Sequence, residues 1–195
     1  MESNKILSLL QDTEGVLDGH FLLTSGRHSN IYFEKFRILE HPSDLDSVCK
    51  EMAKIVEDKN IELVLGAAIG GILIAGGVGR YLNVKHIFSE RNNGKMELRR
   101  GFSIAKGQRV LIVEDIITTG GSVFELIELV QSYGGEVIHV VNLVDRSSSS
   151  VDFRVPSTAL LTMPSESWEP NACPLCKKGN KLTQRGRTGK EVELV

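Results

Sequence analysis

The sequence predicts an α/β fold in which a mostly parallel sheet is flanked by helices. Two observations support this prediction. The runs 61–65, 109–113 and 137–144 are apolar almost throughout, as expected for strands that are buried on both faces of a sheet. The first two of these runs are each followed by a glycine-containing loop and then by a helical period, which is the pattern of strand–helix–strand units.

The remaining elements follow from spacing and from glycine or proline breaks. An amphipathic helix is expected over 3–17, ended by Gly19, and a strand–turn–strand over 21–36. Pro42 opens a helix that runs to about residue 59. Helices over 72–81 and 122–133 and a strand over 85–88 complete the alternating part. The segment 89–107 has no clear period, and the pattern weakens beyond Pro156.

Composition excludes several classes of protein. The 195 residues carry 23 basic and 25 acidic side chains, so a protein that coats nucleic acid is not expected. The most apolar stretch, 66–79, is too short and too rich in glycine to span a bilayer. Three cysteines form no secreted disulfide framework, and the first residues lack the pattern of a signal peptide. A cytoplasmic location and no membrane partner are therefore expected.

The segment 110–122 is the most informative part of the chain. A buried strand delivers two adjacent carboxylates, followed by a loop of hydroxyl and glycine residues and then a helix N-terminus. Glycines let backbone N–H groups approach an anion, and the helix end adds favourable partial charge. The alternative is a plain strand-to-helix turn with Ser122 as the N-cap. The candidate binding residues are Glu114, Asp115, Ile116, Ile117, Thr118, Thr119, Gly120, Gly121 and Ser122.

This pattern resembles the signature of the type I phosphoribosyltransferases, which bind phosphoribosyl pyrophosphate (PRPP). Other segments resemble the orotate phosphoribosyltransferases within that family. They are the strand pair around the Ser25-Gly26-Arg27 turn, the glycine-rich loop 66–71, the Asp145-Arg146 pair, and a Cys-Pro-x-Cys tail of the kind found in a bacterial subgroup. The resemblance covers roughly residues 15–150.

The resemblance implies a type I phosphoribosyltransferase fold with an N-terminal strand–turn–strand hood and an irregular C-terminal tail. We expect one phosphoribosyltransferase domain over 1–165, with 1–40 contributing the hood, and an appendage over 166–195. The implied reaction is transfer of phosphoribosyl from PRPP to orotate in pyrimidine biosynthesis, with Mg²⁺ carried by the substrate. The alternatives are a phosphoribosyltransferase for a purine or other base, and a non-catalytic PRPP-sensing regulator.

The resemblance also assigns roles to residues. The implied catalytic residues are Lys95, Arg91 and Asp115. PRPP would be bound by Arg91, Lys95, the segment from Glu114 to Ser122, and Ala68, Ile69 and Gly70. Orotate would be bound by Thr118, Arg146, Tyr32 and Phe33. For Arg146 the physical reason is that a planar guanidinium binds a carboxylate bidentately; the alternative is a surface arginine paired with Asp145.

The segment 91–100 would be a mobile catalytic loop that reaches into the neighbouring subunit of a homodimer. Six basic residues and one acidic residue lie between Arg91 and Arg109, which suits a pyrophosphate. The sequence departs from the family pattern where Thr24 and Asn92 replace lysines and Glu97 replaces a histidine. Arg99 and Arg100 are additional cations. The alternative is a solvated charged loop.

Cys173 and Cys176 look like half of a zinc ribbon. A structural zinc site needs four ligands, and the only other cysteine, Cys49, is distant in sequence. The pair could share a metal across two subunits, or could be a reduced pair that packs a turn. The five histidines are scattered without metal-ligand spacing and indicate no particular site. The six basic residues of 177–190 are expected to be a solvated tail.

Overall fold

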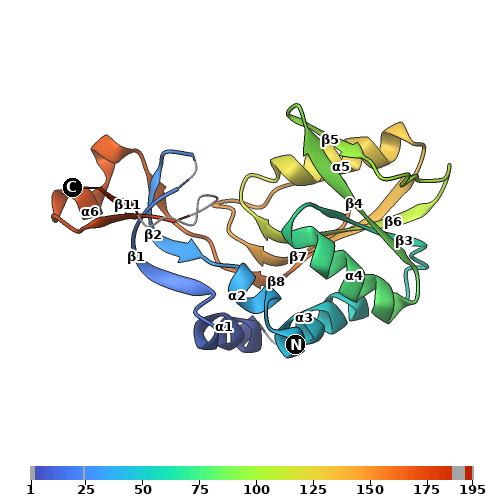
Figure 1. Ribbon diagram of the computed structural model, residues 1–195, viewed down its shortest axis with the longest axis horizontal. Helices are drawn as coiled ribbons and strands as arrows, with labels where there is room; N and C mark the ends of the chain where they lie inside the picture. Colours follow the sequence, from blue (N-terminus) through green and yellow to red (C-terminus); the bar gives the residue numbers. More distant parts are fainter. Residues whose placement is uncertain (1–2, 24, 186–191, 195) are drawn as a thin grey trace.

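The computed structural model describes residues 3–23, 25–185 and 192–194. Its larger part is a six-stranded sheet in the order β5-β4-β3-β6-β7-β8 (Figure 1). The strands are β3 (Leu63–Ala67), β4 (Lys85–Asn92), β5 (Lys95–Leu98), β6 (Arg109–Ile117), β7 (Glu136–Asp145) and β8 (Ser157–Thr162). All neighbours are parallel except β4 and β5, which form an antiparallel hairpin. The predicted α/β class with a mostly parallel sheet is therefore confirmed.

Helices cover both faces of this sheet and create a core on each (Figure 1). One face packs against α1 (Ser3–Asp12), α2 (Phe36–Leu39), α3 (Pro42–Lys54) and α4 (Gly70–Leu82). The other face packs against α5 (Gly121–Ser132). Central strand residues such as Leu111 and Ile112 are fully buried. The unbroken apolar runs in the sequence therefore reflect burial on both faces.

A second, five-stranded sheet joins the two ends of the chain, in the order β11-β10-β1-β2-β9. β1 (Val16–Leu22) and β2 (His28–Phe33) form an antiparallel pair with a bulge between Asp18 and Phe21. The C-terminal segment adds β9 (Ser167–Trp168), a 3-10 turn (Pro170–Ala172), α6 (Pro174–Lys177), β10 (Leu182–Gln184) and β11 (Val192–Leu194). Figure 1 shows this sheet as a lobe beside the larger one.

Several expected boundaries differ from the structure. The first helix ends at Asp12, and Gly19 lies inside β1, because pairing with β2 overrides the weak helical period of residues 13–17. The segment 89–107 contains the end of β4 and all of β5, whose Met96 and Leu98 pack against the core. The tail beyond residue 165 forms short elements paired to the hood.

Two features expected from the sequence concern residues that the structure does not describe. Thr24 and residues 186–190 of the basic tail lie outside the described residues. Among the helices that the structure describes, none combines the length and the apolar character needed to cross a membrane.

Candidate active site

The carboxyl ends of β3, β6 and β7 meet at one edge of the large sheet, beside the end of β2. A cavity of about 1180 Å³ opens there between the two sheets. In parallel α/β sheets this edge is the usual ligand site. The cavity is lined by Leu23, Ser25, Arg27, Tyr32, Phe33, Lys35, Ile116, Thr118, Thr119, Arg146, Ser148, Pro164, Ser165, Glu166, Ser167 and Trp168.

The acid pair lies buried at the base of this edge. The Glu114 carboxylate accepts a hydrogen bond from the Asp115 N–H at 3.0 Å, and the Asp115 carboxylate accepts one from the Ile116 N–H at 2.6 Å. Lys35 Nζ lies 2.6 Å from Asp115 Oδ2. Burial, and secondly the neighbouring Asp115 charge, raise the pKa of Glu114 above its ordinary value. Glu114 therefore favours its neutral form, and Lys35 compensates the charge of the neighbouring Asp115.

The loop after β6 turns directly into α5. Gly120 is the N-cap residue and has φ +79°, a conformation that favours glycine. A Cβ at Gly120 would also lie 2.8 Å from the Phe153 ring. Ser122 lies inside the helix, so the alternative that it is the N-cap is wrong. Thr118 and Thr119 face the cavity, and the first N–H groups of α5 are at the same loop.

The turn from β3 into α4 is tighter than expected, because α4 already begins at Gly70. A Cβ at Gly66 would lie 2.2 Å from the Gly71 carbonyl oxygen, and one at Gly70 would lie 1.8 Å from Asp115 Oδ2. Only glycine lets these backbones approach so closely. Ala68 and Ile69 form the turn, and the Ile69 side chain is exposed. The turn therefore lies against the acid pair.

Arg146 projects into the cavity from the end of β7. Its guanidinium lies 4.7 Å from the Phe33 ring centroid and donates to Ser165 Oγ at 2.6 and 3.0 Å. Asp145 instead accepts hydrogen bonds from Ser147, so the alternative of an Asp145–Arg146 surface pair is wrong. Burial lowers the pKa of Arg146. A planar cation stacked on an aromatic ring and half-buried in a cavity suits a carboxylate ligand.

Arg91 and Lys95, the other two cationic residues predicted for the site, lie outside the cavity. Arg91 and Lys95 sit on the β4–β5 hairpin, where Arg91 pairs with Glu125 of α5 at 2.8 Å. Asn92 donates to Glu97 across the same hairpin, and Arg100 pairs with Glu90. Of the described residues that line the cavity, none belongs to this hairpin. Thr118, Thr119 and Arg146 therefore line one cavity, and the acid pair lies behind it in contact with the lining residue Lys35, whereas Arg91 and Lys95 lie away from it.

Comparisons with known proteins agree with this geometry. A family profile described as a phosphoribosyl transferase domain matches residues 37–172. The chain is 48% identical over 186 residues to an orotate phosphoribosyltransferase of Desulforamulus reducens, covering 95% of this chain and 97% of that protein. It is 49% identical over 186 residues to the one from Pelotomaculum thermopropionicum, covering 95% and 98%.

The chain belongs to the orotate phosphoribosyltransferase family. It is a glycosyltransferase of the type I phosphoribosyltransferase fold. The crystal structure of orotate phosphoribosyltransferase from Aeropyrum pernix matches with a TM-score of 0.69 and 27% identity, over 81% of this chain and 93% of that one. The expected family and fold are thus confirmed.

At the candidate site of this orotate phosphoribosyltransferase, the sequence did not predict two contributions. Lys35 follows β2 by two residues and reaches Asp115, which is 80 residues away in sequence. The segment 164–168 forms a wall of the cavity and holds the Arg146 partner Ser165. A lysine directly after a strand that delivers aromatic residues was a usable signal for the first. The second carried no local signal, because its role depends on tertiary pairing.

Proposed function

We propose that the chain transfers the phosphoribosyl group of PRPP to a ring nitrogen of orotate, giving orotidine 5′-phosphate and pyrophosphate. The C–O bond to pyrophosphate breaks, the leaving group keeps the electron pair, a C–N bond forms at the anomeric carbon, and orotate loses its N–H proton. The observation that carries the proposal is the position of Arg146, which shares one cavity with the threonines of the phosphate-type loop. Orotate has a carboxylate and purine bases do not.

Each substrate part has a matching group in this site. The loop from Thr118 to Ser122 offers hydroxyls and helix N–H groups to the 5′-phosphate. Glu114 and Asp115 suit the ribose hydroxyls, which both donate and accept hydrogen bonds. Tyr32 and Phe33 form an aromatic side of the base pocket next to Arg146. The transition state is oxocarbenium-like, so positioning and stabilisation of the leaving pyrophosphate supply most of the catalysis.

The donor set also fits Mg²⁺ arriving with PRPP. The carboxyl groups of Glu114 and Asp115 are both buried. They offer only oxygen ligands, which hard cations prefer. Burial, and secondly the Asp115 charge, raise the pKa of Glu114, so a cation nearby would favour its charged form. When bound, Mg²⁺ would neutralise charge on pyrophosphate. The residues that would face its water shell are Glu114 and Asp115.

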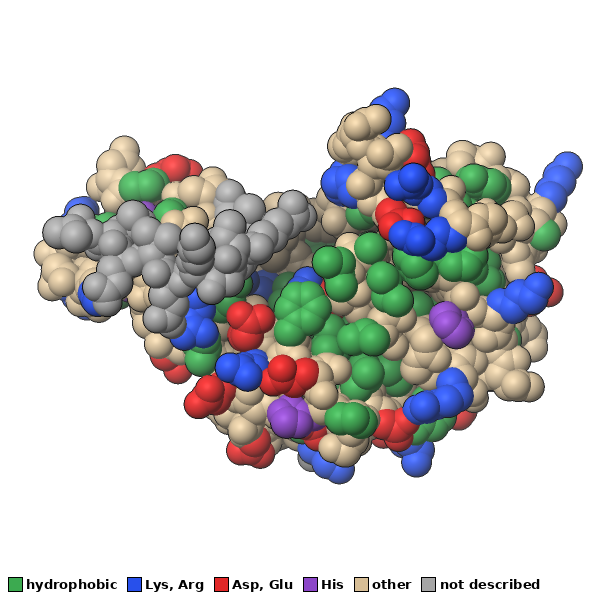
Figure 2. All heavy atoms as spheres, viewed as in Figure 1, with side chains coloured by type: hydrophobic (Ala, Val, Ile, Leu, Met, Phe, Trp, Pro, Cys, Tyr) green, Lys and Arg blue, Asp and Glu red, His purple; other side chains and the backbone are tan. Residues whose placement is uncertain are grey.

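We further propose a homodimer in which the β4–β5 hairpin serves the partner's cavity. The hairpin carries Arg91 and Lys95 outside the cavity of its own chain. Figure 2 shows apolar side chains gathered over α2 and α4, below the charged hairpin. These include Phe36, Ile69 and Leu73, which are 42%, 72% and 45% exposed. An apolar surface of this kind beside the hairpin supports a subunit interface there.

The activity is tested by mixing the purified protein with orotate, PRPP and Mg²⁺ and following the loss of orotate absorbance. Turnover of orotate is expected. Turnover of hypoxanthine, xanthine or adenine in its place would contradict the assignment of Arg146. Binding of PRPP without turnover of any base would favour the regulator.

Sharing of the hairpin is tested with Lys95→Ala and Arg146→Ala, assayed at an orotate concentration near the wild-type KM, where the raised KM of Arg146→Ala leaves it almost no activity. Co-expression with two different tags allows the mixed dimer to be purified. If Lys95 serves the partner's cavity, the mixed dimer has one intact site of two and recovers about half of the wild-type activity. If Lys95 serves its own cavity, neither site is intact and the mixed dimer stays inactive, which would refute the shared hairpin.

A further inference from the structure

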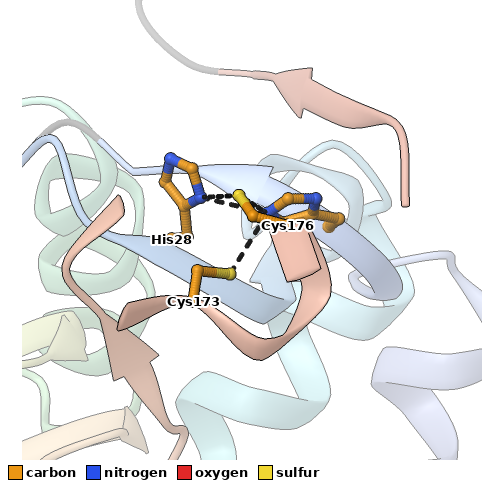
Figure 3. Close-up of side chains that lie close together, drawn as sticks. His28, Cys173 and Cys176 are labelled. Carbon is orange, nitrogen blue, oxygen red and sulfur yellow. Dashed lines mark hydrogen bonds between the residues drawn. The ribbon is translucent and has the colours of Figure 1, made fainter. Parts of the chain in front are cut away.

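Four metal-ligating side chains converge in the small sheet, away from the active-site cavity. They are His20, His28, Cys173 and Cys176, and their ligand atoms all lie within 4.8 Å of one another. Figure 3 shows His28, Cys173 and Cys176 pointing toward a common point from β2 and from the C-terminal segment. The sequence spacing of the histidines gave no sign of this arrangement, because the fold brings two of them beside the cysteine pair.

The distances match tetrahedral coordination. His20 Nε2 lies 3.0 Å from His28 Nδ1 and 3.5 Å from Cys173 Sγ. Cys176 Sγ lies 3.3 Å from His28 Nδ1 and 3.7 Å from His20 Nε2. Zinc bonds of about 2.0 Å to nitrogen and 2.3 Å to sulfur, at tetrahedral angles, place ligand atoms about 3.3 to 3.8 Å apart. These four separations are close to the tetrahedral values; an ion would bring the whole set, which spans up to 4.8 Å, slightly closer together and would move the two imidazoles slightly apart.

The surroundings of the cluster are also those of a metal site. His20, His28 and Cys173 are buried, and Cys176 is exposed, which leaves a route for the ion. The second ring nitrogen of His20, Nδ1, lies 2.9 Å from the Asn180 carbonyl oxygen. A hydrogen bond to a backbone carbonyl fixes the orientation and tautomer of metal-bound histidines. Both cysteines are free thiols.

The backbone explains how residues far apart in sequence meet. The register of β1 against β2 shifts between Asp18 and Phe21, and His20 lies within this irregular stretch. His28 is the first residue of β2 and pairs with Trp168 of β9. Five residues after Trp168, Cys173 begins the Cys-Pro-Leu-Cys turn of α6, where Lys177 N–H donates to the Cys173 carbonyl. The hood supplies two ligands and the tail supplies the other two.

We propose that these four side chains form a structural Zn²⁺ site that fastens the C-terminal segment to the N-terminal hood. Four protein ligands leave no open coordination position, so the ion has no catalytic role. Two thiolates and two imidazoles favour zinc over Mg²⁺ or Ca²⁺, which prefer oxygen ligands. Cys49, the third cysteine, is not part of the site and packs against α4. The site is independent of the transfer reaction proposed above.

Metal analysis of the untagged protein, purified without chelators, tests the proposal directly. About one zinc ion per chain is expected, bound by the four protein ligands. His20→Asn and Cys176→Ser should lose it, whereas His86→Asn, an exposed histidine outside the cluster, should keep it. His20→Cys should retain zinc, because cysteine is also a zinc ligand. A network of hydrogen bonds alone would bind no metal in any of these variants.

Cobalt substitution of the wild-type chain provides a test that needs no variant to fold. Tetrahedral Co²⁺ with thiolate ligands should give a charge-transfer band in the near ultraviolet and intense visible d–d bands. Wild-type protein that takes up neither zinc nor cobalt would overturn the proposal. So would zinc that persists in both His20→Asn and Cys176→Ser, or a Cys173–Cys176 disulfide in freshly purified protein.

Discussion

Arg146 offers the sharpest test of the base assignment. Truncation in Arg146→Ala removes a guanidinium that lies over Phe33 and is oriented by Ser165. A bidentate contact to a carboxylate comprises two hydrogen bonds to a charged group, each worth about 1.5 kcal/mol or more. The loss of about 3 kcal/mol corresponds to a rise in the KM for orotate of about 100-fold.

The effect should fall on KM rather than on kcat. The orotate carboxylate keeps its charge during the reaction, so its contact with Arg146 is equally strong in the ground state and in the transition state. Arg146→Lys keeps the positive charge but loses the planar fork, and an intermediate rise of about tenfold is expected. Steady-state kinetics with each substrate varied in turn measure both constants.

A matched control is Arg80→Ala, at the end of α4, where Arg80 pairs with Asp46 on an exposed surface. Its kinetics should equal those of the wild type. A rise in the KM for PRPP with an unchanged KM for orotate would refute the base-site assignment of Arg146. An Arg146→Ala variant with a KM for orotate within about threefold of wild type would show that the guanidinium does not contact the substrate.

Three substitutions test the acid pair. Burial raises the folded-state pKa of Glu114 above its ordinary value of about 4.5. The stability that neutral Glu114 contributes is therefore fully present below about pH 4.5 and is lost as the pH rises through the folded-state pKa. The free energy of unfolding of Glu114→Gln should therefore rise relative to that of the wild type by more than about 1 kcal/mol between about pH 5 and about pH 8. Urea unfolding at several pH values measures this difference. Gly70→Ala should cost about 1 to 3 kcal/mol and weaken PRPP binding, because its Cβ displaces Asp115 from Lys35. Lys35→Met should cost about 2 kcal/mol in urea unfolding and raise the KM for PRPP, because it leaves a buried carboxylate unpaired.

Gly70→Ala and Lys35→Met each have a control in the same chain. Gly76→Ala lies on the same helix as Gly70, but its Cβ would be 3.6 Å from His86, an ordinary contact, and should leave PRPP binding unchanged. Lys54→Met removes a surface pair and should change stability by less than about 1 kcal/mol. A constant stability difference between Glu114→Gln and wild type across the pH range would contradict the raised pKa of Glu114.

The large sheet was predictable because its signals are local. Runs such as 109–113 are apolar on both faces, so the strand and its burial follow from a few neighbouring residues. β5 and β8 were missed because they are edge strands, where half of the side chains face solvent and a short sequence shows no unbroken apolar run. The helix expected at 13–17 failed because a tertiary pairing, β1 with β2, outweighs weak local preference.

The candidate site was predictable to the extent that single segments carry chemistry. Glu114, Asp115 and the loop after them form one motif, and they lie together at one strand end. The contact of Lys35 with Asp115 and that of Arg146 with Ser165 depend on chain segments that only the fold brings together. The four metal-ligating residues are the extreme case, since His20 and Cys173 are 153 positions apart. The spacing of residues along the sequence reveals a site whose residues share one turn. It does not reveal a site whose residues come from distant segments of the chain.

The position of the proposed zinc cluster connects the C-terminal segment to a wall of the cavity. Ser167 and Trp168 form a wall of the cavity and pair with Ser29 and His28 of β2. Arg27 fixes the same wall through hydrogen bonds to Ser167. His28 is therefore both a metal ligand and the strand partner of a cavity residue. An ion that joins His28 to the Cys173 turn would shorten the unattached chain segments next to this wall. It would therefore reduce the motion of the wall more than the motion of the six-stranded sheet. The C-terminal segment therefore contributes directly to the wall of the cavity through Ser167 and Trp168.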